Sequence, residues 1–202
     1  MKEGTLYLQV SRGAAPRDFS FPASSVPPTI VAFAQAKTLI GKGYKEEGQR
    51  IMTIEDLRWG RSDIKSVQLL YPCLVRNLAC SRGLDDDWLV KDGYVTEGVS
   101  SNACIVTNDG VLVTRHLSSA ILGGITRDAI VRAAREMGLA LEERPFTVRE
   151  AQLAAEAFST SSPTFVNPVV EIDNVMIGTG KPGEIGKVLY QLYMQRALSE
   201  AL

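Results

Sequence analysis

Lys65 and Glu97 are the two side chains whose types and positions could carry chemistry. Lys65 lies in "RSDIKS", between an expected strand and an apolar helical segment, and Glu97 lies in "VTEGVSSN", after two β-branched residues. A lysine amine removed from water has a lowered pKa and reacts with carbonyl groups to form Schiff bases. Each residue also has an ordinary interpretation, as a surface lysine or a solvated turn glutamate, because charged side chains are seldom buried.

The segment "GGITRD", residues 123–128, could bind an anion. Its two glycines allow the backbone to approach a ligand closely. Thr126, the predicted N-cap of the helix that follows, would offer a hydroxyl and a backbone N–H at a helix N-terminus. "STSSP", residues 159–163, could add hydroxyl groups to the same anion or could be an ordinary serine-rich loop. Phosphate is the anion that this pattern suits.

A Schiff-base lysine, a carboxylate and an anion site at a helix end are together the three parts needed to bind pyridoxal 5′-phosphate. The lysine would bond the aldehyde, the carboxylate would keep the pyridine nitrogen protonated, and the helix end would take the phosphate. This cofactor gives Glu97 a role that a solvated turn would not.

The composition is that of an ordinary soluble protein. The 202 residues are 45% hydrophobic, with 22 basic and 23 acidic side chains, so no general field attracts nucleic acid. No apolar run approaches the roughly 20 residues of a membrane-spanning helix, and "MKEGTLYLQV" lacks a signal-peptide pattern. One histidine and three cysteines without metal-type spacing argue against a metal site. We expect a cytoplasmic protein that binds neither nucleic acid nor membrane.

The elements that must position these residues mix strands and helices irregularly. Strands are expected at 5–10 and 49–56, and strand hairpins are expected to turn at Asp92-Gly93, at 108–110 and within 168–178. Helices are expected after Pro72 and before Gly83, over 123–138, after a Thr147–Glu150 capping box, and over 182–202. Because strands and helices do not alternate strictly, we predict a mixed-sheet α/β domain.

Five stretches carry a family resemblance: "LYLQVSRGAAPRDFSFP", "RWGRSDIKSVQLL", "VKDGYVTEGVSSNACIV", "ILGGITRDAI" and "NPVVEIDNVMIGTGKPG". In them the chain resembles the class IV aminotransferases, the fold-type IV group of pyridoxal-phosphate enzymes, and most of all the D-amino-acid aminotransferases. The resemblance implies a large mixed-sheet cofactor domain over residues 41–202. It also implies that residues 1–40 are the C-terminal part of a small α+β domain with the interdomain loop, and that the protein is a homodimer.

The resemblance also assigns the site. Lys65 would be the catalytic lysine that bonds the cofactor, and Glu97 the partner of the pyridine nitrogen. Arg17 would bind the substrate carboxylate, with Phe19 beside it. The remaining cofactor-binding residues would be Arg58, Ser101, Asn102, Leu122, Ile125, Thr126, Ser161 and Ser162.

The implied reaction moves an amino group between an amino acid, such as D-alanine, and a 2-keto acid. Phe19 stands where D-amino-acid aminotransferases usually have histidine, which leaves a 4-amino-4-deoxychorismate lyase and an (R)-amine transaminase of the same fold as alternatives. Pro163 stands where a hydroxyl residue is usual. Family members also carry an earlier N-terminal segment with an arginine and a tyrosine of the site, so a truncated, inactive cofactor-domain fragment is the non-enzyme alternative.

Two other features have simpler interpretations. Cys73 and Cys80 are spaced to share one helix face, and we interpret them as small apolar packing residues. The acidic stretch "LDDDW" is interpreted as a solvated turn.

Overall fold

The computed structural model describes residues 3–40 and 43–200. The chain divides into two units, Met1–Gly43 and Tyr44–Leu202, which we describe separately. The boundary expected from the sequence, near residue 40, lies close to this division. The assignment of the first unit to the end of a small domain stays a prediction.

The first unit is a two-stranded antiparallel sheet of β1 (Gly4–Ser11) and β2 (Thr29–Ala36), joined by a long loop. Tyr7 and Phe33 lie opposite each other in the register and stack with their ring centroids 4.9 Å apart. The strand expected at 5–10 is confirmed as β1. The connecting loop carries Arg17 and Phe19.

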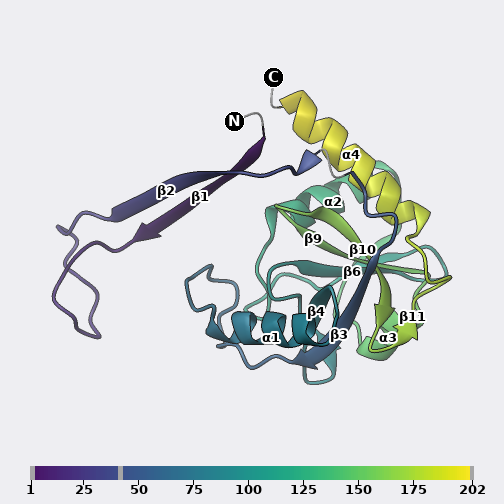
Figure 1. The fold of residues 1–202 in the computed structure, drawn as a ribbon, viewed down its shortest axis with the longest axis horizontal. Coiled ribbons are helices and arrows are strands. Elements are labelled where there is room, and N and C mark those ends of the chain that lie inside the picture. Colours follow the sequence, from purple (N-terminus) through teal and green to yellow (C-terminus); the bar gives the residue numbers. More distant parts are fainter. Residues whose placement is uncertain (1–2, 41–42, 201–202) are drawn as a thin grey trace. The chain divides into compact units, whose positions relative to one another are not determined.

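The second unit is built on a nine-stranded mixed sheet in the order β5-β4-β3-β10-β9-β6-β7-β8, with β11 paired to β10. Figure 1 shows β3, β4, β6, β9 and β10 of this sheet. β3 runs parallel to β4 and to β10, and β7 runs parallel to β8, while the other pairs are antiparallel. The predicted mixed α/β sheet is therefore confirmed. The strands are β3 (Gln49–Glu55), β4 (Asp86–Lys91), β5 (Tyr94–Val95), β6 (Asn102–Val106), β7 (Leu112–Thr114), β8 (Leu141–Glu143), β9 (Glu156–Ser161), β10 (Phe165–Ile172) and β11 (Val175–Met176).

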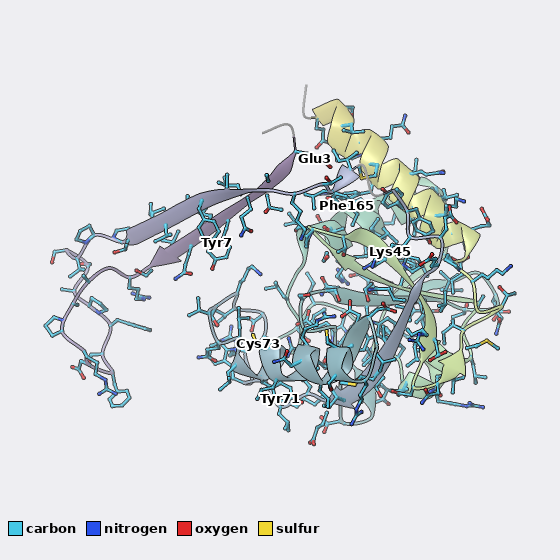
Figure 2. The ribbon with its side chains drawn as sticks, in the orientation of Figure 1. Glu3, Tyr7, Lys45, Tyr71, Cys73 and Phe165 are labelled. Carbon is cyan, nitrogen blue, oxygen red and sulfur yellow. The ribbon has the colours of Figure 1, made fainter. Side chains whose placement is uncertain are left out.

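In the described part of the chain, four helices accompany this sheet: α1 (Leu70–Ser81), α2 (Ile125–Glu136), α3 (Val148–Gln152) and α4 (Glu184–Glu200). α1 packs on β3 and β4, whereas α2 and α4 pack on each other and on β9, and α4 also on β10 (Figure 1). Figure 2 shows Phe165, at the start of β10, beside α4, where its ring meets Tyr190 and Tyr193. Among the described residues, no helix is long and apolar enough to cross a membrane.

The alternation of β6 shows how the sheet divides the core. Ala103 and Ile105 join a cluster with Trp88 and Phe146 on one face, and Cys104 and Val106 join the cluster beneath α2 and α4 on the other. A strand buried on both faces has no polar side. Its first residue, Asn102, is also buried, and it reaches the candidate site.

Local signals in the sequence set most turns correctly. Asp92 and Gly93 both have positive φ, 53° and 81°, and link β4 to β5 as predicted. The Thr147 hydroxyl accepts from the Glu150 N–H at the start of α3, which confirms that cap. α1 begins at Leu70, two residues before Pro72, which still lies in the first turn.

Two interpretations were wrong. Cys73 and Cys80 are exposed on α1 rather than packed, and Figure 2 shows Cys73 on that helix. In "LDDDW", Asp86 and Asp87 are buried at the start of β4, where Arg76 of α1 pairs with Asp86. An ionic partner from a neighbouring helix allows carboxylates to be buried that would otherwise form a solvated turn.

Candidate active site

Glu97 is a buried carboxylate that accepts hydrogen bonds from three residues. Arg58 donates from Nη1 to Oε1 at 2.6 Å, and Asn102 donates from Nδ2 to Oε2 at 2.9 Å. The Leu122 N–H donates to both oxygens, at 3.1 and 3.0 Å. Asn102 Nδ2 also donates to the Leu122 carbonyl at 2.8 Å. The solvated-turn interpretation is therefore wrong, and the sequence-predicted residues Arg58, Glu97, Asn102 and Leu122 come together.

Burial dominates the electrostatics of Glu97. Its side chain is 5% exposed, and this desolvation raises its pKa from 4.5 to about 7 although Arg58 and the Leu122 N–H act to lower it. A carboxyl group of this kind stays fixed in one orientation while its proton occupancy responds to a nearby charge. It can therefore hold a cationic N–H group of a ligand.

The loop that carries Lys65 joins this network. Arg58 Nη2 donates to the Ala120 carbonyl at 3.3 Å, and the Ser62 N–H donates to the Ser119 carbonyl at 2.8 Å. The segment from 56 to 69 is thus tied to the same stretch, residues 119–122, that reaches Glu97. Lys65 itself is exposed, three residues beyond Ser62. Its catalytic role stays a prediction.

The N-terminus of α2 lies against Asn102. Gly124 is the N-cap of this helix, and the prediction of Thr126 as N-cap was wrong. A Cβ on Gly124 would lie 2.2 Å from Asn102 Oδ1, so only glycine permits this approach of helix and strand. Thr126 is instead a buried first-turn residue, and its Oγ1 has no hydrogen-bond partner within the described chain.

Further polar atoms of the same region fit a phosphate-bearing cofactor. Thr160 on β9 lies opposite Asn102 on β6, so both side chains leave the sheet on the same face. Thr160 Oγ1 and Ser101 Oγ, like Thr126 Oγ1, are buried without a partner among residues 3–40 and 43–200. Buried hydroxyls normally find a partner. The Thr126 hydroxyl at the start of α2, with Thr160 on the strand beside Asn102, suits the several acceptor oxygens of a phosphate.

The other predicted residues are more exposed. Ser161 shares a hydrogen bond of 2.6 Å with Thr164, and Ser162 is exposed in the turn after β9. Ile125 begins α2 with its side chain exposed. In the first unit, the Arg17 guanidinium lies 4.6 Å from the centre of the Phe19 ring, and both residues are exposed. The roles of these residues stay predictions.

Sequence reasoning missed Asp56 and Thr96. Asp56 accepts from Arg58 Nε at 2.9 Å and Nη2 at 2.7 Å, and from Thr96 Oγ1 at 2.8 Å. The Asp-x-Arg spacing in "EDLRW" allows such a local fork and could have indicated it. Thr160 lies in "STSSP", which the sequence offered as a source of hydroxyl groups, but its place opposite Asn102 depends on strand pairing.

Comparison with known proteins places this chain in a family. The model of the family described as amino-transferase class IV matches residues 1–172. The chain is 38% identical to the D-alanine aminotransferase of Bacillus licheniformis over 98% of its own length and 69% of that protein's.

Solved structures agree with this. The branched-chain aminotransferase of Thermoproteus uzoniensis with norvaline is 26% identical with a TM-score of 0.80, over 96% of this chain and 65% of that one. The branched-chain amino acid aminotransferase of Thermobaculum terrenum in its PLP-form shares the fold, at 24% identity and a TM-score of 0.77, over 95% of this chain and 64% of that one. The chain thus spans about two thirds of the length of these relatives. It belongs to the class IV aminotransferase family.

Proposed function

We propose that the protein is a pyridoxal 5′-phosphate-dependent transaminase that moves an amino group between a D-amino acid, such as D-alanine, and a 2-keto acid. The observation that carries this proposal is the buried Glu97 carboxylate, fixed by Arg58, Asn102 and the Leu122 N–H. Family membership supports the cofactor, and relatives named D-alanine aminotransferase support the substrate class.

Each residue would have a distinct task. When bound, the cofactor supplies an electron-withdrawing ring that absorbs negative charge formed at the substrate α-carbon. Glu97 would hold a proton at the pyridine nitrogen, and the α2 N-terminus with Thr126 would bind the phosphate. Lys65 would bond the aldehyde covalently, and its amine, once freed, would act as the base that moves the proton at the substrate α-carbon.

The direct test is an assay of amino transfer from D-alanine to 2-oxoglutarate, with L-alanine as the control donor. We expect pyruvate and glutamate to form from the D-isomer and a Lys65→Ala variant to lose this activity by several orders of magnitude. A matched Lys91→Ala variant, at an exposed strand end, should remain active. Pyruvate release from 4-amino-4-deoxychorismate without amino transfer would identify a lyase instead and refute the proposal.

We also propose that the protein acts as a homodimer. The loop containing Lys65 and the first half of α1 expose several large apolar side chains. Exposed apolar side chains gathered in one segment are typical of interaction sites, and their position around Lys65 favours a second copy that completes the active site. The residues are Leu57, Ile64, Val67, Leu69, Leu70 and Leu74.

Analytical ultracentrifugation tests the dimer. A Leu70→Glu variant should sediment as a monomer at concentrations where the unmodified protein is dimeric, because it places a charge within this surface. Leu153→Glu, which changes a similarly exposed leucine at the end of α3, should leave the dimer intact. A monomeric unmodified protein, or a dimeric Leu70→Glu variant, would contradict this interface.

A further inference from the structure

The hydrogen bonds of Arg58 are divided unequally between two carboxylates. Asp56 Oδ1 accepts from Arg58 Nε at 2.9 Å and from its backbone N–H at 3.1 Å, and Asp56 Oδ2 accepts from Nη2 at 2.7 Å. Of the Arg58 donors, only Nη1 reaches Glu97, at 2.6 Å. The Nε and Nη2 donors of Arg58 therefore face Asp56, and Nη1 remains for Glu97.

All three charged groups are largely removed from water. Asp56 and Glu97 have side chains that are 5% exposed, and Arg58 is 12% exposed. If both acids ionise, two negative charges share one positive charge. Arg58 and Asp56 are the charged groups that act on Glu97, and its other donors, Asn102 and the Leu122 N–H, are neutral.

The two acids are held in different states. Burial alone would raise the pKa of Asp56, but hydrogen bonds from Arg58 and Thr96 outweigh it, and the pKa is lowered. Glu97, with fewer charged donors, has its pKa raised by burial. Neighbouring acids whose environments separate them in this way have separate roles. The lowered pKa favours the ionised form of Asp56, and the raised pKa favours proton binding by Glu97.

We propose that Asp56 is a positioning residue: it occupies the Nε and Nη2 side of Arg58, so that Arg58 contacts Glu97 through Nη1 alone. Glu97 can then share a proton more strongly with the ligand group that it faces. The proposal rests on the proposed function only in naming that group, the pyridine nitrogen. The effect on Glu97 itself does not require the cofactor.

The test is a pH titration of Glu97 in the protein freed of cofactor, followed by carbon-13 NMR of labelled glutamate carboxyls. The Glu97 signal is assigned by its absence in a Glu97→Gln variant. In an Asp56→Asn variant the guanidinium of Arg58 no longer shares its charge with Asp56, so the Glu97 midpoint should fall by about one pH unit, a tenfold loss of proton affinity. Asp56→Glu, which keeps the charge, should restore the midpoint.

Asp63→Asn is the matched control. Asp63 accepts from Arg61 Nε at 2.9 Å and Nη2 at 2.7 Å in the same local fork, but that pair is exposed and lacks a second carboxylate partner within the described residues. Its loss should leave the Glu97 midpoint unchanged. If Asp56→Asn does not fold, Asp56→Ser provides the same loss of charge without placing an NH₂ group against Arg58. An unchanged or raised Glu97 midpoint in the folded variant would overturn the proposal.

A second measurement separates this proposal from the proposed function. Affinities are compared for pyridoxal 5′-phosphate and for its analogue with carbon in place of the ring nitrogen. Asp56→Asn should reduce the preference for the natural cofactor about tenfold, matching the change in proton affinity. If Glu97→Gln reduces this preference and Asp56→Asn does not, Asp56 is not a positioning residue, and the proposed function is unaffected. If the unmodified protein shows no preference, the role of Glu97 in the proposed function fails, and the NMR titration still decides the role of Asp56.

Discussion

Replacing Glu97 by glutamine should flatten the pH dependence of stability of the protein freed of cofactor. The pKa of Glu97 is about 7 in the folded chain, against 4.5 for an unperturbed glutamate. The folded state therefore binds this proton more tightly than the unfolded state. The stability that the proton contributes is fully present below pH 4.5 and is lost as pH rises through 7.

The size of the effect follows from the shift. The difference, 7 minus 4.5, is 2.5 pH units, and at 1.36 kcal/mol per unit it corresponds to about 3 kcal/mol. Between pH 5 and pH 8 most of this is lost, so stability should fall by about 2 to 3 kcal/mol through Glu97. Glutamine stays neutral, so the loss of stability caused by its contacts with Arg58 and Asn102 is about the same at every pH.

Urea denaturation at intervals from pH 5 to pH 8 measures the difference between the two proteins. The unmodified protein should lose stability across this range relative to Glu97→Gln. A Glu136→Gln variant controls for a surface carboxylate, because Glu136 pairs with Arg196 in an exposed position and should leave the slope unchanged. Parallel pH profiles for the unmodified protein and Glu97→Gln would refute the assignment of Glu97 as a buried proton-binding group.

Two further substitutions test the framework of the site. Gly124→Ala should weaken cofactor binding at least tenfold in a fluorescence titration, because its Cβ would lie 2.2 Å from Asn102 Oδ1. Gly123→Ala is the control: its Cβ would make only an ordinary contact with a side chain at 3.6 Å, so this variant should bind the cofactor normally. Ser159→Ala should lower the free energy of unfolding by about 1 to 3 kcal/mol in denaturant titrations, because the buried Trp88 Nε1 donates to Ser159 Oγ at 2.9 Å and would lose its acceptor. A variant as stable as the unmodified protein would contradict a stabilising role of this hydrogen bond.

The sequence identified the parts of this fold that depend on near neighbours. The turn at Asp92-Gly93 forms because both positions need positive φ, which glycine and aspartate tolerate. The Thr147 cap needs only a donor three residues later. By contrast, the burial of Asp86 depends on Arg76 reaching from α1, and the exposure of Cys73 depends on which face of that helix meets β3 and β4. Neither contact has a local signal.

The start of α2 shows the same limit within the site. Thr126 has the side chain of a good N-cap, yet the helix begins earlier, at Gly124. Asn102 occupies the space beside Gly124 and leaves no room for a side chain at that N-cap position. Strand pairing rather than local propensity brings Asn102 to this position, and Thr126, in the first turn of the helix, keeps a hydroxyl that has no partner among the described residues.

The charge of the site depends on residues from distant segments and favours a particular ligand. Glu97 receives its donors from Arg58, 39 residues earlier, and from Leu122, 25 residues later. The guanidinium of Arg58 already donates to Asp56 through Nε and Nη2. If both acids ionise, one negative charge therefore remains unbalanced in a region largely removed from water. Such a charge is costly unless it is paired or protonated. A ligand with a protonated ring nitrogen removes that cost, whereas a neutral ring would leave Glu97 to take up a proton from solvent.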